Sequence, residues 1–452
     1  MSEEEICMVL DTFMYLNYYG AMDGETLGEI VEKLSDNPLY GPTGVYHGEY
    51  EILLNAVGDE DISKLRIGNQ SRQMGGYNHG TNACTFYNEE NHSVYAVYRG
   101  TGDGEWLDNG RGMSECHTPQ QQEALQWFEE AMDNLEVAEE TRVIVTGHSK
   151  GGNKAQYVTM EYADADMIDK CVTVDGQGFS KVQIEEWKQE YGEEGFWERT
   201  GKIFGINGEN DFVNVLGFSI VPLSQISYLR TPIAKENVAG YHDIKYMFDT
   251  YTDESGDIHF SSNRNSLVMD RGIVGDWAYE LSVEVMELPE EQRRASAATL
   301  MQMMEMLDGG KDSVNGEKLS FAELKTFVLA GIPVIVSSLT EKEEGNNLIR
   351  AVLTNDNLGG YLPKGKRMRV DTQMLFQGAA ELWETSRLLG NILFSVETHQ
   401  KEVPWYMHTT EFLNLSFDSL EHELSQIKQK IETLASLQED IARKYRSIRP
   451  FT

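Results

Sequence analysis

Short runs of β-branched and aromatic residues alternate with amphipathic helical runs between residues 84 and 210. The strand-like runs cover residues 84–87, 93–98, 142–146, 171–174 and 202–206. The helical runs cover residues 120–135, 150–162 and 181–191, and Thr118 and Pro119 supply an N-cap and a first-turn proline to the first of them. Strands that alternate with helices predict an α/β fold with a mainly parallel sheet.

The β pattern fades from about residue 275, and residues 286–307 are helical in composition. A further helix is expected to start at Asp371 or Thr372 and to run to about residue 398. After a break at 403–405, apolar residues recur at three- and four-residue steps over 417–448. Two long helices joined by a short break predict an antiparallel helical hairpin.

These patterns divide the chain into three predicted parts. An α/β domain covers residues 1–272, a helical region with a linker covers 273–365, and the hairpin covers 366–452. Three glycines and a proline within 359–365 supply the linker. The apolar seam of the hairpin needs a cover, which is expected to be a small helical partner protein rather than the α/β domain.

The chain carries a net charge of −36, of which residues 367–452, with 10 basic and 12 acidic residues, hold only −2. An acidic body of this kind repels phosphate groups, so nucleic acid is excluded as a partner held by charge, and anionic lipid headgroups are not attracted. The four cysteines lie far apart without a C-x-x-C pair, and no H-E-x-x-H motif occurs. We therefore expect no metal and no cofactor.

Neither the apolar runs nor the start of the sequence predict a membrane segment. The longest apolar run, 326–339, is too short to span a bilayer and contains Pro333, so a buried helix is expected there. The opening M-S-E-E-E has acids where a secretory signal needs basic residues. The expectation is a protein without a Sec signal, either cytoplasmic or exported by another route.

Residues 143–154, V-I-V-T-G-H-S-K-G-G-N-K, run from a strand through a glycine-rich turn into a helix. Gly147 and Gly151 allow the tight turn that strains Ser149 and directs its hydroxyl above the sheet. The backbone N–H of Lys150, at the start of the helix, would then face a carbonyl group under attack. The pattern predicts a nucleophile elbow, and the competing interpretation is a turn with a capping serine.

A second donor to the oxyanion is expected after strand 93–98, in Y-R-G-T-G-D-G-E-W-L-D-N, where the N–H of Thr101 is the candidate. A dinucleotide loop fits this stretch poorly, because its third glycine is misplaced and no helix begins at once. R-G-T and E-W-L-D followed by G-H-S-K-G-G resemble the class 3 lipases and related α/β-hydrolase-like proteins of Gram-positive bacteria. The resemblance covers about residues 1–270, assigns a donor to Thr101 and implies a lid between Gly102 and Thr118.

The order of the triad in this fold, serine then acid then histidine, limits the partners of Ser149. His242 and His259 are the histidines that follow it before the hairpin, and His242 is preferred because similar Y-H-x-I-x-Y segments occur in the related bacterial proteins. Asp175 and Asp211 each end a strand after the elbow. The acid of the family follows the second of these strands, so Asp211 is favoured and Asp175 is the alternative.

The resemblance implies a serine ester hydrolase that acts on lipid or other acyl esters through an acyl-enzyme. The alternative is a secreted or scaffolding protein whose hairpin binds a helical partner and whose hydrolase fold is cargo or an inactive relic. The hairpin resembles the small helical proteins of type VII secretion, which implies export by that route. It departs from them because its break contains P-W-Y rather than W-x-G and no Y-x-x-x-[DE] signal follows.

Overall fold

The computed structural model describes residues 1–308 except 17, 19, 72–79, 103, 136–139, 232–237, 253–257, 263–266 and 269–270, together with residues 432, 436 and 439. The chain divides into two compact units, of which the first contains residues 1–327 and 344–358. The second unit, with the predicted hairpin and its partner surface, lies almost wholly outside the described residues. The three predicted domain boundaries therefore stay predictions.

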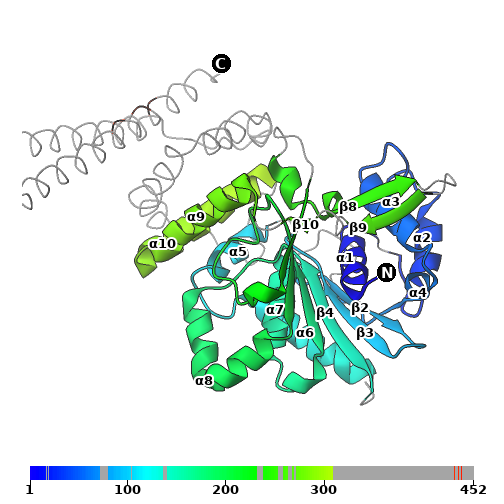
Figure 1. Ribbon diagram of the computed structural model, residues 1–452, viewed down its shortest axis with the longest axis horizontal. Coiled ribbons are helices and arrows are strands. Elements are labelled where there is room, and N and C mark those ends of the chain that lie inside the picture. The colour runs from blue at the N-terminus through cyan, green and yellow to red at the C-terminus, as the bar shows by residue number, and fades with distance from the viewer. Residues whose placement is uncertain are drawn as a thin grey trace, which may run out of the picture. The chain divides into compact units, whose positions relative to one another are not determined.

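The α/β fold is confirmed by an eight-stranded sheet in the order β1-β2-β3-β4-β5-β6-β7-β10 (Figure 1). The strands from β3 to β7 run parallel to one another, and β1, β2 and β10 pair antiparallel at the two edges. The strands are β1 (Arg66–Gly68), β2 (Ala83–Asn88), β3 (Ser93–Tyr98), β4 (Arg142–His148), β5 (Lys170–Val174), β6 (Ile203–Gly208), β7 (Ile226–Leu229) and β10 (Leu267–Val268). A separate antiparallel pair joins β8 (Phe248–Thr252) to β9 (Ile258–Ser262).

Helices cover both faces of the sheet, because successive side chains of a strand point to opposite sides. On β3, Tyr95 and Val97 belong to one apolar core, whereas Val94, Ala96 and Tyr98 belong to the other. The first core is closed by α1 (Glu3–Phe13), α2 (Leu27–Leu34), α3 (His47–Ala56) and α4 (Glu60–Ser63). The second is closed by α6 (Pro119–Leu135), α7 (Lys150–Glu161) and α8 (Lys181–Thr200).

Two further helices, α9 (Ile273–Glu287) and α10 (Glu290–Asp308), follow the sheet, as the helical composition of this region predicts. α10 packs closely on α5 (Trp106–Gly112), where a Cβ atom on Gly110 would lie 2.8 Å from the carbonyl oxygen of Ala297 (Figure 1). Among the described residues, no helix is both long and apolar enough to cross a membrane.

Candidate active site

Ser149 lies in a strained turn between β4 and α7. Its φ and ψ angles are 61° and −127°, a backbone region that non-glycine residues rarely adopt. The turn needs both flanking glycines, since a Cβ atom on Gly147 would lie 2.3 Å from the carbonyl carbon of Gly151, and one on Gly151 would lie 2.1 Å from the carbonyl oxygen of Tyr98. The predicted elbow geometry is therefore present at Ser149.

The structure brings Ser149, His242 and Asp211 together in one hydrogen-bonded chain. The Ser149 hydroxyl oxygen lies 2.7 Å from Nε2 of His242, and Nδ1 of His242 lies 2.6 Å from Oδ1 of Asp211. With a carboxylate facing Nδ1, that nitrogen carries the proton and Nε2 accepts from the serine. His242 ends a short 3₁₀ turn, η3 (Val238–His242), whereas the rival His259 lies on β9.

Asp211 follows β6 and is held by its own loop. Its Oδ2 accepts hydrogen bonds from the backbone N–H groups of Val213 at 3.0 Å and Asn214 at 2.6 Å, and its side chain is fully buried. These bonds fix the orientation of the carboxyl group, so that its Oδ1 faces Nδ1 of His242.

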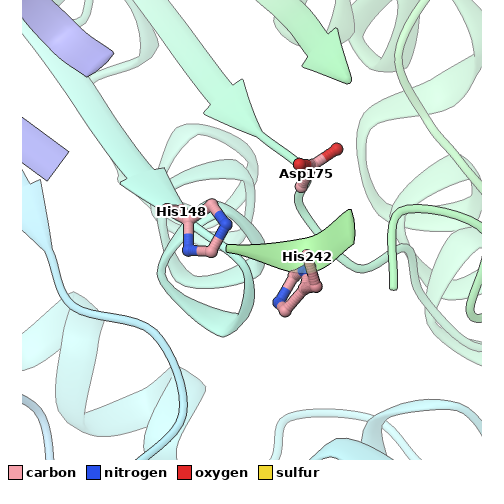
Figure 2. A group of neighbouring side chains, drawn as sticks. All are labelled: His148, Asp175 and His242. Carbon is pink, nitrogen blue, oxygen red and sulfur yellow. The ribbon is translucent and has the colours of Figure 1, made fainter. Parts of the chain in front are cut away.

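Asp175, the alternative acid, ends β5 and also reaches the histidine. One of its carboxylate oxygens lies within 4.8 Å of a ring nitrogen of both His242 and His148. Figure 2 shows these three side chains as one group. Burial, with the neighbouring Asp211 as the next cause, raises the pKa of Asp175 well above its usual range. Asp175 and Asp211, the two candidate acids at strand ends, therefore lie at one site with His242.

His148 precedes the nucleophile and stacks on His242, with ring centroids 4.7 Å apart and planes 29° from parallel. Its Nδ1 lies 2.6 Å from the hydroxyl oxygen of Tyr15, which follows α1. Burial and then the neighbouring His242 lower the pKa of His148 well below its usual range. Neither His148 nor Tyr15 was identified from the sequence, although His148 stands inside the G-H-S-K-G-G motif.

His148, Asp175 and His242 have the side chains of a metal site, yet their bonds fit another role (Figure 2). Both nitrogens of His242 already contact Ser149 and Asp211, and Nδ1 of His148 contacts Tyr15. A metal ion would have to displace the serine or the carboxylate from His242. The donor set therefore fits a hydrogen-bonded network around Ser149 better than a metal centre.

The predicted oxyanion donors belong to two segments that meet beside Ser149. A Cβ atom on Gly100, which precedes Thr101, would lie 3.1 Å from the Cβ atom of Ser149, and Lys150 begins α7. The hydroxyl of Thr101 accepts a hydrogen bond of 2.8 Å from Nδ2 of Asn109 on α5. The loop that carries Thr101 is thereby fastened to the next helix.

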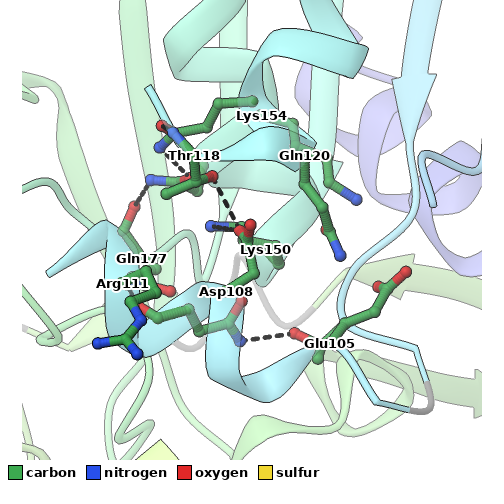
Figure 3. Close-up of polar contacts among 12 residues, drawn as sticks. Glu105, Asp108, Arg111, Thr118, Gln120, Lys150, Lys154 and Gln177 are labelled. Atoms are coloured by element: carbon green, nitrogen blue, oxygen red, sulfur yellow. Dashed lines mark hydrogen bonds and ion pairs between the residues drawn. The ribbon is translucent and has the colours of Figure 1, made fainter. Parts of the chain in front are cut away.

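A buried polar cluster behind the elbow ties α5 to α7 (Figure 3). Nζ of Lys150 lies 2.9 Å from Oδ2 of Asp108, and the same oxygen accepts from the Thr118 hydroxyl at 2.9 Å. The side chain of Gln177 donates to the carbonyl oxygen of Asn109 at 2.8 Å. The sequence predicts a role only for the backbone N–H of Lys150. In the structure its side chain also holds the start of α7 to α5.

Part of this cluster lies within residues 102–118, where a glycine-rich lid is expected from the resemblance. The structure places the buried helix α5 there, with α10 lying across it. Gly110 allows the backbones of these helices to approach closely at Ala297 and Ala298. Gly110 therefore serves packing and α5 is a buried helix, while the lid itself stays a prediction.

Lys150→Met is expected to destabilise the protein by about 3–5 kcal/mol, because Asp108 would keep a buried charge without its cation. The substitution leaves the backbone N–H of residue 150 in place. Urea unfolding monitored by circular dichroism measures the loss. The double variant Lys150→Met/Asp108→Leu removes both charges and should recover most of it, and an equal loss in the double variant would contradict this role of the ion pair.

An apolar cluster of Trp106, Val213 and Met301 joins α5, the Asp211 loop and α10, with Phe212, Leu216 and Leu300 packed against it. The ring of Phe212 lies 5.6 Å from that of His242, measured between centroids. Phe212 therefore links an apolar cluster built from three elements to the histidine end of the site.

Part of this domain is similar to a known protein family. A family model described as Mbeg1-like matches residues 61–194, a family associated with a lipase-like α/β fold. No curated protein matches the chain. The matched segment contains Thr101, Ser149 and Lys150 and ends before Asp211 and His242, so the likeness to this family covers the nucleophile half of the site.

Proposed function

We propose that this protein is a serine hydrolase that cleaves carboxylic esters through an acyl-enzyme. The observation that carries the proposal is the chain of hydrogen bonds from Ser149 through His242 to Asp211, at 2.7 and 2.6 Å. A serine hydroxyl bonded to an imidazole that is oriented by a buried carboxylate is the arrangement that nucleophilic acyl transfer requires. The match to a family with a lipase-like fold supports the same class.

In the proposed reaction, His242 takes the proton of the Ser149 hydroxyl as its oxygen attacks the ester carbonyl carbon. Asp211 stabilises the imidazolium that forms. The N–H groups of Thr101 and Lys150 donate to the oxyanion of the tetrahedral intermediate, with the dipole of α7 favouring the same charge. The intermediate collapses, the alcohol leaves with the proton from His242, and water activated by His242 releases the acid.

The surroundings of the site favour an ester with an apolar acyl group, as in lipids. Phe212 adjoins His242, and it packs with the apolar cluster formed by Trp106, Val213 and Met301. The strongly negative body disfavours an anionic substrate that approaches through solution. We therefore propose neutral acyl esters, such as glycerides or short-chain carboxylic esters, as the substrate class.

Labelling with a fluorophosphonate probe tests the proposal directly, because such probes react with a serine only when its hydroxyl is activated. The wild-type protein is expected to be labelled and Ser149→Ala to remain unlabelled. Ser224→Ala, which removes an exposed hydroxyl, is the matched control and should be labelled like the wild type. Equal labelling of wild type and Ser149→Ala would reject Ser149 as the nucleophile.

A further inference from the structure

Two buried carboxyl groups lie beside His242, and the proposed reaction uses only that of Asp211. Asp175 is 1% exposed, and its Oδ1 accepts hydrogen bonds from the backbone N–H of Gly208 at 2.7 Å and from Nδ2 of Asn214 at 3.1 Å. Asn214 also donates its backbone N–H to Asp211. One loop therefore holds both acids against the same histidine.

The second oxygen of Asp175, Oδ2, is buried and is left without a hydrogen-bond partner among the described residues. The nearby acid is Asp211, because Asn214 donates its side-chain Nδ2 to Asp175 and its backbone N–H to Asp211. Two ionised carboxylates in contact repel each other strongly, so such a pair retains one proton. Asp211 accepts two backbone hydrogen bonds on its own Oδ2, which leaves Asp175 as the proton holder.

The other titratable groups around Asp175 do not supply a compensating positive charge. His148, from β4, has a lowered pKa because it is buried and lies beside His242. Tyr228, from β7, has a raised pKa, with burial as the largest cause. His242 already directs Nδ1 to Asp211. A proton shared with Asp211 is what remains to offset the charge of Asp175.

We propose that Asp175 and Asp211 form a one-proton carboxyl pair, in which Oδ2 of Asp175 holds the proton and donates it to Asp211. Asp175 is then a positioning residue that keeps Asp211 oriented towards His242 with a single negative charge. It is also a latent second acid, since one of its oxygens lies within 4.8 Å of a His242 nitrogen. The role of this pair in catalysis rests on the proposed function. The location of the proton is independent of that function.

Asp175→Asn is the conservative variant for a test, because an amide keeps a donor where the protonated carboxyl group has one. The backbone supports the choice. Asp175 has a φ of 45°, in the left-handed region that asparagine adopts more readily than most residues. The substitution therefore retains shape, backbone conformation and hydrogen bond, and removes only the ability to ionise.

The kinetic test compares Asp175→Asn in two backgrounds. In the wild-type background, kcat/KM is expected to fall by no more than about fivefold, because Asp211 still carries the charge. In an Asp211→Ala background, Asp175 loses its acidic neighbour, ionises and orients His242, so Asp175→Asn should cost about 100-fold more. An equal factor in both backgrounds would mean that Asp175 only supports the fold.

An infrared measurement locates the proton without relying on activity or on an Asp211 variant. At pH 7, the carbonyl stretch of a protonated carboxyl group is expected in the wild type and in Ser149→Ala, and the contribution of Asp175 to it should be lost in Asp175→Asn. Asp11 is a second buried acid with a raised pKa, caused mainly by burial, so the wild-type minus Asp175→Asn difference spectrum is the readout. An empty difference spectrum would overturn the proposal even if Ser149 is labelled, whereas absence of labelling would reject the function and leave the pair intact.

Stability against pH gives a third readout with a defined sign. Asp175 keeps its proton in the folded protein and loses it in the unfolded chain above a pH of about 4. The wild type should therefore lose stability relative to Asp175→Asn as pH rises from about 4 towards the folded-state pKa. Urea midpoints of the two proteins measured from pH 4 to 8 should diverge, and parallel midpoints would contradict a protonated Asp175.

Discussion

Ser149→Ala is expected to lower ester hydrolysis by about four to six orders of magnitude while the fold stays intact. The hydroxyl contacts His242 and is 3% exposed as a residue, and no other described serine contacts that ring at hydrogen-bond distance. Alanine keeps the Cβ atom and the strained turn, so the lower rate of hydrolysis reflects the missing hydroxyl rather than a change in the fold. Turnover of a p-nitrophenyl acyl ester, with circular dichroism as a check of folding, measures the effect.

Ser224→Ala is the control for this experiment, because it removes an exposed serine hydroxyl from the 3₁₀ turn η2 (Leu223–Gln225). Its turnover should equal that of the wild type. If Ser149→Ala retained more than about a tenth of the wild-type rate, the covalent mechanism would be rejected, because a residue that forms the acyl-enzyme cannot be dispensable. Folding of the variant separates such a result from damage to the protein.

The parallel sheet could be predicted because its strands are buried on both sides and alternate with amphipathic helices. The predicted run 93–98 and strand β3 (Ser93–Tyr98) coincide, and β6 (Ile203–Gly208) begins one residue later than its predicted run. The edge strand β1 has three residues, which is too short for a detectable period. It is recognised only through its antiparallel pairing with β2.

The residues of the site separate into those with a local signal and those without one. Ser149 and its glycines stand in a contiguous motif, whereas chain order and the resemblance are what predict Asp211 and His242. The choice between Asp175 and Asp211 could not be made on local sequence, because both end parallel strands and such ends meet at the same edge of a sheet. In the structure both strand ends do lie at this edge, and both acids are near His242.

Contacts between distant segments account for what the sequence did not reveal. Tyr15 and His148 are 133 positions apart, and no periodicity links them. The E-W-L-D stretch is part of a recognisable motif, but the ion pair from Asp108 to Lys150 depends on how α5 and α7 pack. The close approach of α10 to α5 at Gly110 likewise depends on how distant segments pack, and no local pattern indicates it.

His242→Ala is expected to reduce ester hydrolysis about as far as Ser149→Ala does, by about four to six orders of magnitude. The imidazole is the group that contacts both the serine hydroxyl and the Asp211 carboxylate, so its removal leaves the hydroxyl without a base and the acid without a function. Both proposed oxyanion donors are backbone groups and persist. The residual rate should therefore be that of the oxyanion hole and substrate binding alone.

The double variant Ser149→Ala/His242→Ala gives the sharper result, because groups that act as one unit do not contribute additively. It should be no slower than either single variant. His259→Ala, which changes the rival histidine on β9, is the matched control and should keep the wild-type rate. If the two losses multiplied, Ser149 and His242 would act independently, and the hydrogen bond of 2.7 Å between them would not be the route of the proton.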